Sequence, residues 1–230
     1  MCRVSAASVK KVDPTATKIV ITEERSRDWE IPEVEEIISM PGTPWTHLTK
    51  ISHLTRFVLT HPDWEILSID SDTLVLKPFP FPETDLWLTW RRFIKNMKDL
   101  STKGDVGTHT YNGGVWGLRC SRNGHEIMIW MRERLRRMSE SNREWWGDQS
   151  ALYELAGPPP LEGGGSEVHK VRFPIDGVID GDHISIAKIP CEEWNYSPTK
   201  KDEDVISKGI LHFKGGSREF FPEYAQRLGL

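Results

Sequence analysis

The stretch that decides the fold is Glu65–Leu76 (EILSIDSDTLVL), an apolar run that two aspartates interrupt. Glu65–Ile69 is predicted to be a strand, and Thr73–Leu76 continues the apolar run. Asp70 and Asp72 therefore follow the carboxyl end of a strand, where open α/β sheets bind their ligands. Because side chains alternate along an extended chain, a turn is needed to bring both carboxylates toward one cation. These hard oxygen ligands suit Mn²⁺ or Mg²⁺, and two solvated loop aspartates are the plain alternative.

Strands and helices are predicted to alternate on both sides of this stretch. Apolar runs predict further strands at Lys18–Thr22, Leu86–Trp90, Gly113–Leu118, Ile184–Ile189 and Gly209–Phe213. Helices are predicted at Val4–Val12, from Thr43 to His61, after Asn123 and from about Asp148. The helix before the aspartates repeats apolar residues at helical spacing, namely Leu48, Ile51, Leu54 and Val58. This alternation predicts an α/β fold with a mostly parallel central sheet flanked by helices.

The length and composition are those of a single globular domain. The 230 residues can bury one core, so we expect one domain over residues 1–230. Residues 157–165 (GPPPLEGGG) exclude regular structure, which predicts a flexible loop at 157–169. An α/β domain normally opens with a strand, and none precedes the predicted helix Val4–Val12. We therefore expect that the natural first strand is missing.

Charge and cysteine content exclude several classes of partner. The formal net charge of −4 does not favour nucleic acid, because nucleic-acid-binding domains concentrate Lys and Arg. No apolar stretch reaches the length of a membrane span, and the N-terminus lacks a signal-peptide pattern. Cys2, Cys120 and Cys191 are far apart and odd in number, which favours a reducing compartment. The cytoplasm is therefore the expected location.

Three further motifs carry polar side chains next to glycines or at element ends. Tyr111–Val115 (YNGGV) opens a predicted strand, and its glycines would let a substrate approach the backbone closely. Gly147-Asp148-Gln149 places a carboxylate and an amide at a helix start, where a simple cap is the plain alternative. His212–Gly216 (HFKGG) offers an imidazole for a metal and a lysine for phosphate. A lone histidine, however, is more often structural.

Taken in order, the segments IDSDTLVL, YNGGVWGL, WGDQ, WNY and HFKGG resemble the GT-A glycosyltransferases. The similarity is greatest to glycosyltransferase family 8, which includes glycogenin and bacterial galactosyltransferases. It runs from about the first helix to Gly216, which is most of the chain. The resemblance implies the GT-A nucleotide-diphospho-sugar transferase fold. Two departures are the absent first strand and Gly216–Glu219 in place of the family's proline-tryptophan.

The resemblance also implies a role for individual residues. It implies that Asp70, Asp72 and His212 bind the metal, Mn²⁺ or Mg²⁺, and that Lys214 and Gly215 contact the donor diphosphate. Asn112 and Gly113 would contact the donor as well, and Asp148 and Gln149 would act in catalysis. Lys50 resembles a basic residue that contacts the donor, although Arg56 competes for that role.

The implied activity is metal-dependent transfer of a sugar from a nucleotide-diphosphate donor, by analogy a UDP-sugar. The acceptor would be a carbohydrate or glycoconjugate, and the anomeric configuration would be retained. One alternative is a haloacid-dehalogenase-type phosphatase, because a strand ending in Asp-x-Asp also opens that site; Gly181-Asp182 would then mimic its later acidic motif. Another alternative is a catalytically inactive module that binds a sugar or nucleotide.

Overall fold

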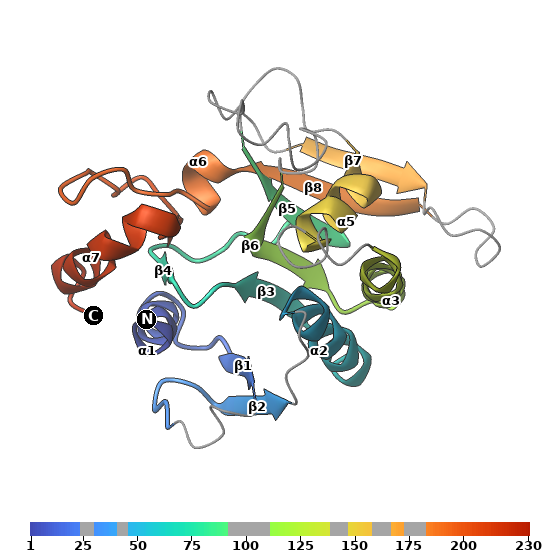
Figure 1. The fold of residues 1–230 in the computed structure, drawn as a ribbon, viewed down its shortest axis with the longest axis horizontal. Helices are drawn as coiled ribbons and strands as arrows, with labels where there is room; N and C mark the ends of the chain where they lie inside the picture. Colours follow the sequence, from blue (N-terminus) through green and yellow to red (C-terminus); the bar gives the residue numbers. More distant parts are fainter. Residues whose placement is uncertain (24–29, 41–45, 92–110, 139–146, 158–166, 173–182) are drawn as a thin grey trace. The chain divides into compact units, whose positions relative to one another are not determined.

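The computed structural model describes residues 1–23, 30–40, 46–91, 111–138, 147–157, 167–172 and 183–230 (Figure 1). The chain forms two compact units, each built from segments that are distant in the sequence. The first unit comprises Met1–Pro41, Ile69–Pro80 and Cys191–Leu230. The second unit comprises Gly42–Ser68 and Phe81–Pro190.

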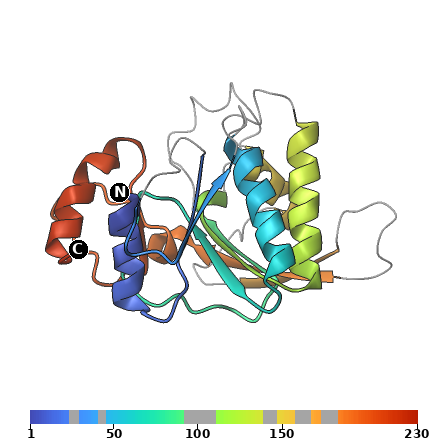
Figure 2. The same cartoon turned by 90° about the horizontal axis from the view of Figure 1, so that it is seen from below.

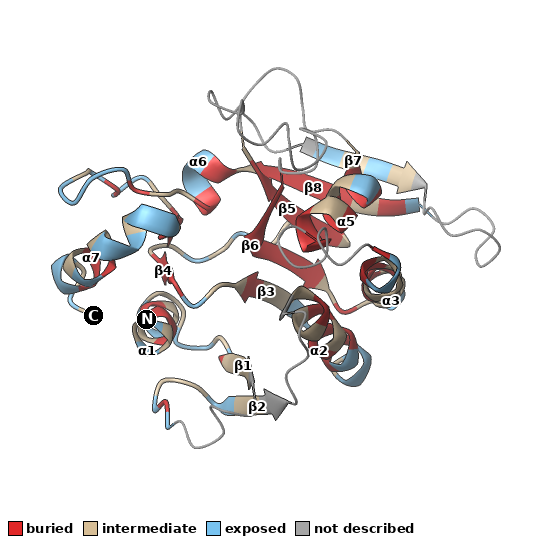
Figure 3. Ribbon diagram, in the orientation of Figure 1, coloured by how far each residue is buried: buried red, intermediate tan, exposed pale blue. Residues whose placement is uncertain are grey.

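A five-stranded sheet, in the order β3-β6-β5-β8-β7, is the framework of the second unit. Its strands are β3 (Glu65–Ile69), β6 (Tyr111–Arg119), β5 (Leu86–Trp90), β8 (His183–Pro190) and β7 (Glu167–Arg172). All of β5 and all but the last residue of β6 are buried (Figure 3). This continuous burial explains why both strands are recognisable as apolar runs in the sequence.

The sheet is mixed, so the prediction of a mostly parallel sheet is wrong. β5 runs parallel to β8, whereas β6 is antiparallel to β5 and β7 is antiparallel to β8. An apolar run indicates that a strand is buried on both faces, but it does not show the direction of the strand. The antiparallel strand β6 is buried in this way too. The alternating strand–helix order therefore predicted the fold class correctly but not the direction of every strand.

Helices α2 (Thr46–Thr60), α3 (Arg122–Arg137) and α5 (Gly147–Ala156) belong to the same unit. α2 and α3 lie side by side along their length, and α5 contacts both helices and β6 (Figure 2). The helical spacing seen in the sequence is confirmed, because four apolar residues of α2 are buried: Leu48, Ile51, Leu54 and Val58. The predicted helix start at Thr43-Pro44 lies outside the described residues.

The first unit contains short elements packed on a small core. Its strands are β1 (Ile19–Glu23) and β2 (Glu36–Met40), which are parallel, and β4 (Thr73–Val75) and β9 (Ile210–His212), which are antiparallel. Its helices are α1 (Cys2–Val12), α6 (Cys191–Trp194), the 3-10 helix η4 (Gly215–Phe220) and α7 (Phe221–Arg227). Leu74, Val205, Leu211, Phe213, Phe221 and Tyr224 form its core.

Several elements were not apparent from the sequence. They are β2, β7, α6, η4 and α7, all short and without a clear apolar period. Most of the predicted loop, residues 158–166, lies outside the described residues, and Glu167–His169 begin β7. Cys2, Cys120 and Cys191, all within the described residues, form no disulfide. Among the described helices, none is both long enough and apolar enough to cross a membrane.

Candidate metal centre

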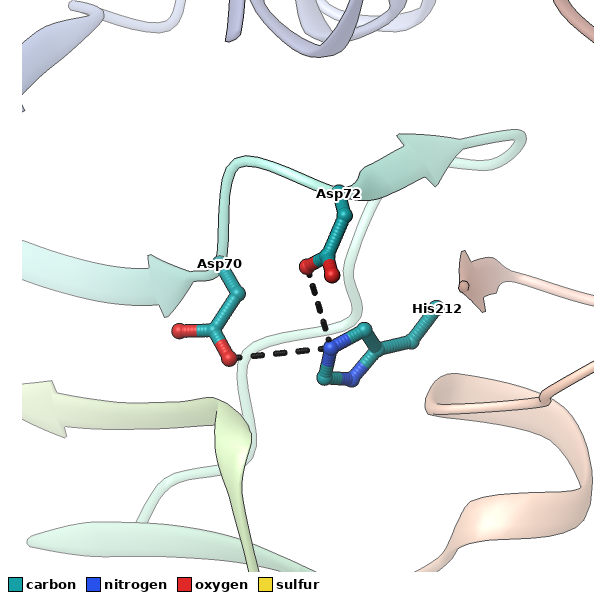
Figure 4. A group of neighbouring side chains, drawn as sticks. All are labelled: Asp70, Asp72 and His212. Carbon is teal, nitrogen blue, oxygen red and sulfur yellow. Dashed lines mark ion pairs between the residues drawn. The ribbon is translucent and has the colours of Figure 1, made fainter. Parts of the chain in front are cut away.

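Asp70, Asp72 and His212 converge within the first unit (Figure 4). One ligand atom from each residue lies within 4.8 Å of the others. The His212 Nε2 atom is 3.2 Å from Asp72 Oδ1 and 3.6 Å from Asp70 Oδ2. The turn between β3 and β4 reverses the alternation expected for an extended chain, so both carboxylates face the same imidazole.

Backbone pairing places His212 opposite the aspartates. In the antiparallel ladder of β4 and β9, His212 is the partner of Thr73. The Phe213 amide donates to the Asp72 carbonyl at 2.9 Å, and the Thr73 hydroxyl donates to the Asp70 carbonyl at 2.8 Å. These bonds fix the turn from both ends. The site is therefore built by a sheet that joins residues about 140 positions apart.

The electrostatics of the cluster favour a bound cation. Burial alone would raise the pKa of Asp72, but hydrogen bonds and charges from His212 in its protonated form and from Arg218 lower it to about 2. Burial lowers the pKa of His212, so its ring is neutral at pH 7. Two carboxylates and a neutral imidazole form a donor set that suits a divalent cation such as Mn²⁺. The residues present therefore fit the metal that the sequence predicts.

Arg218 also contacts the cluster, and the sequence analysis did not assign it a role. Its Nε donates to Asp72 Oδ2 at 2.8 Å from the 3-10 helix η4. The signal in the sequence is weak, because an arginine six residues after a histidine has many plain explanations. Lys214 caps the same helix, and Gly215 has a φ of 52° with no atom within 4 Å of the position of a Cβ. The backbone at Gly215 is therefore open to a ligand.

The other predicted residues form a separate cluster in the second unit. Asp148 is the second residue of α5 and is 3% exposed, and its Oδ2 lies 3.4 Å from His47 Nδ1. Lys50 donates from Nζ to the Gly113 carbonyl at 3.0 Å. A Cβ at Gly113 would lie 2.2 Å from Asp148 Oδ2, so the glycine permits β6 and α5 to approach each other. The space beside Gly113 is thus occupied by the carboxylate.

Two polar side chains next to Asp148 and Gly113 have unpaired atoms. Asn112 Nδ2 and Gln149 Oε1 are buried, and neither has a hydrogen-bond partner among the described residues. One is a donor and the other an acceptor, which is the complement needed by hydroxyl groups. Buried polar atoms normally have partners, so these two atoms point to a polar ligand.

Local charge keeps Asp148 ionised. Burial alone would raise its pKa, but the hydrogen bond and charge of His47, the charge of Lys50 and the Gln149 amide together lower it. Lys50 belongs to this cluster, whereas its competitor Arg56 is exposed on the same helix. His47 was missed by the sequence analysis. The signal for it is that His47 precedes Lys50 by three residues, which places both on one face of α2.

Comparisons with known proteins identify the fold. No protein-family model matches the chain, and no curated protein sequence matches it. A glycosyltransferase involved in the glycosylation of the major capsid of PBCV-1 is similar in structure, with 15% sequence identity and a TM-score of 0.51, over 92% of this chain and 100% of that chain. The galactosyltransferase LgtC, solved in complex with donor and acceptor sugar analogs, has 14% identity and a TM-score of 0.54, over 98% and 91%. The chain therefore has the GT-A glycosyltransferase fold that the sequence predicts.

Proposed function

We propose that this protein is a metal-dependent glycosyltransferase that moves a sugar from a nucleotide-diphosphate donor, a UDP-sugar, to a carbohydrate or glycoconjugate acceptor. The observation that carries the proposal is the convergence of Asp70, Asp72 and His212 in a chain with the GT-A fold. Both similar solved structures are glycosyltransferases, and LgtC was solved with donor and acceptor sugar analogs, which supports these two classes of partner. On this proposal residues 1–230 act as one glycosyltransferase domain.

The residues around the candidate metal centre would hold the donor diphosphate. Asp70, Asp72 and His212 would bind Mn²⁺ or Mg²⁺, which as a Lewis acid stabilises negative charge on the departing diphosphate. Lys214 supplies a further positive charge, and the open backbone at Gly215 lets a phosphate approach closely. The ion pair between Arg218 and Asp72 supports a similar role for Arg218, because its guanidinium already lies at the site.

The cluster in the second unit would position the sugar and the acceptor. The unpaired Asn112 Nδ2 and Gln149 Oε1 would bond to sugar hydroxyls. Asp148, held ionised, would stabilise positive charge that develops at the anomeric carbon. Lys50 and Gly113 would contact the donor, Lys50 through its ammonium group and Gly113 through its backbone.

Transfer is proposed to retain the anomeric configuration. The bond from the anomeric carbon to the diphosphate oxygen breaks, and a bond from that carbon to the acceptor oxygen forms on the same face. The acceptor proton passes to the leaving diphosphate, so no separate strong base is needed. Asp148 would be that base in an inverting enzyme. Proton NMR of the first-formed product from an α-linked donor distinguishes the two, since a β-linked product would reassign Asp148.

The function is tested by supplying nucleotide sugars with and without Mn²⁺. We expect release of nucleoside diphosphate from one UDP-sugar only when metal is present, and loss of this release in Asp72→Asn. Asp202→Asn removes an exposed carboxylate outside the cluster and is the matched control, expected to behave as the wild type. Turnover of an aryl phosphate instead would support the phosphatase alternative. Metal-dependent binding of the nucleotide without turnover would support the inactive binding module.

A further inference from the structure

The segment Trp194-Asn195-Tyr196 is part of the resemblance to glycosyltransferases, yet nothing above gives it a role. In the first unit all three of its residues contact β9 or the residue before it. Trp194 covers Gly209, where a Cβ would lie 2.4 Å from the indole ring. The Tyr196 amide donates to the Ile210 carbonyl at 3.0 Å, and the Tyr196 carbonyl accepts from the His212 amide at 2.7 Å. The segment is therefore fixed against the strand that carries the histidine.

Asn195, between these two anchors, contacts the histidine ring itself. Its Oδ1 lies 3.0 Å from His212 Nδ1, and the two residues are 2% and 4% exposed. The Asn195 backbone amide also donates to the carbonyl of Cys191, the first residue of α6, at 3.1 Å. The backbone on both sides of the Asn195 side chain is thus anchored, and the side chain contacts the imidazole ring from this anchored position.

The partner of Nδ1 bears on which ring nitrogen carries the proton. An amide oxygen is only an acceptor, so the bond to Asn195 Oδ1 requires a proton on His212 Nδ1. A neutral imidazole has one N–H, which leaves a lone pair on Nε2. That lone pair faces Asp72 Oδ1 at 3.2 Å and Asp70 Oδ2 at 3.6 Å. Three groups of electron pairs facing one another repel unless a cation lies among them.

We propose that Asn195 is a positioning residue that holds His212 in the Nδ1–H tautomer, with Nε2 presented to the metal. The inference rests on the proposed function, because it assumes that the cluster binds a metal. Partners behind a ligating histidine usually change metal affinity by roughly 10–100-fold when removed. Removal of the Asn195 side chain is expected to lower the metal affinity by a factor in this range, although Asn195 touches neither substrate nor metal.

The test compares two variants of similar size with the wild-type protein. Asn195→Leu removes the acceptor, and Asn195→Asp keeps an oxygen in the same place. Thr55→Val is the control for loss of a buried polar group, because the buried Thr55 hydroxyl donates to backbone carbonyls of α2 and α3. Mn²⁺ affinity is measured by electron paramagnetic resonance of free Mn²⁺, and the tautomer by nitrogen NMR of the metal-free protein at mildly alkaline pH.

We expect the Nδ1–H tautomer in the wild type and in Asn195→Asp, and its loss in Asn195→Leu. Mn²⁺ affinity should fall by about 10–100-fold in Asn195→Leu and stay within about threefold of the wild type in Asn195→Asp and Thr55→Val. An Nε2–H tautomer in the wild type, or unchanged affinity in Asn195→Leu, would overturn the inference. If the wild type does not bind Mn²⁺, the proposed function fails, and the NMR result still decides the role of Asn195.

Discussion

At the scale of single residues, Asp72 shows how opposing effects determine the state of the site. Burial penalises its charge, but two cations, the Arg218 guanidinium and the His212 ring once it is protonated at low pH, lie within 3.2 Å of its carboxylate. The attraction wins, and its pKa falls to about 2. The carboxylate is therefore ionised, and able to bind a cation, over the whole physiological pH range.

The low pKa of Asp72 predicts a pH dependence of stability in the presence of EDTA. Because the folded-state pKa lies below the unfolded value, the carboxylate stabilises the fold above about pH 4. This contribution, about 2 kcal/mol, is lost as the pH falls from about 4 toward about 2. Urea denaturation of the wild type and of Asp72→Asn across this range measures it. Identical pH profiles for the two proteins would contradict the prediction.

The close approach of Asp148 to Gly113 predicts that substitution of this glycine lowers the stability of the fold. Gly113→Ala would place a methyl group 2.2 Å from Asp148 Oδ2, so the buried carboxylate or the strand must move. We expect a loss of about 1–3 kcal/mol in the free energy of unfolding, typical of overpacking. Gly216→Ala is the control, because no atom lies within 4 Å of its Cβ position. Equal stability of the two variants, measured by chemical denaturation, would show that the Asp148 contact is not tight.

At the scale of elements, helix α1 is hydrogen-bonded to β4, the strand that follows the aspartates. The Ser5 hydroxyl lies 3.2 Å from the Thr73 hydroxyl, which in turn donates to the Asp70 carbonyl. The Val75 amide donates to the Ser8 hydroxyl at 2.9 Å. A helix near the N-terminus thus holds β4 on the side that its pairing with β9 leaves open.

The hydrogen bond between Ser8 and β4 predicts that Ser8→Ala destabilises the first unit. The Val75 amide would lose its partner in a buried place, which costs about 1–3 kcal/mol. Hydrogen exchange of the Val75 amide should accelerate, and chemical denaturation should show the loss of stability. Lys10→Ala changes an exposed residue of the same helix and should leave both quantities unchanged. Unchanged exchange of the Val75 amide in Ser8→Ala would contradict the role of this hydrogen bond.

At the scale of the whole molecule, metal and nucleotide binding should stabilise the native state. A ligand that binds only the folded chain adds about 2.7 kcal/mol at 100 times its dissociation constant. For a chain of this size we expect a rise in Tm of roughly 5–10 °C with UDP and Mn²⁺ together. EDTA should reverse the rise, and UMP, which lacks the β-phosphate, should produce little. An equal rise with UDP in EDTA would contradict metal-dependent binding.

The sequence by itself determined the α/β class, the GT-A resemblance and most buried elements. Strands such as β5 and helices such as α2 were recognisable because burial imposes an apolar run or a helical period on neighbouring residues. Two of the candidate metal ligands were also recognisable, since Asp70 and Asp72 stand one residue apart in a motif.

Only the tertiary structure decided strand direction and the partners of each polar side chain. The mixed sheet, the Arg218–Asp72 ion pair and the Asn195–His212 hydrogen bond all join residues that no local pattern links. Short elements such as η4 carry too few residues for a period to emerge. The physical reason is that burial is encoded locally in a sequence, whereas hydrogen-bond and charge partners are selected by the packing of distant segments.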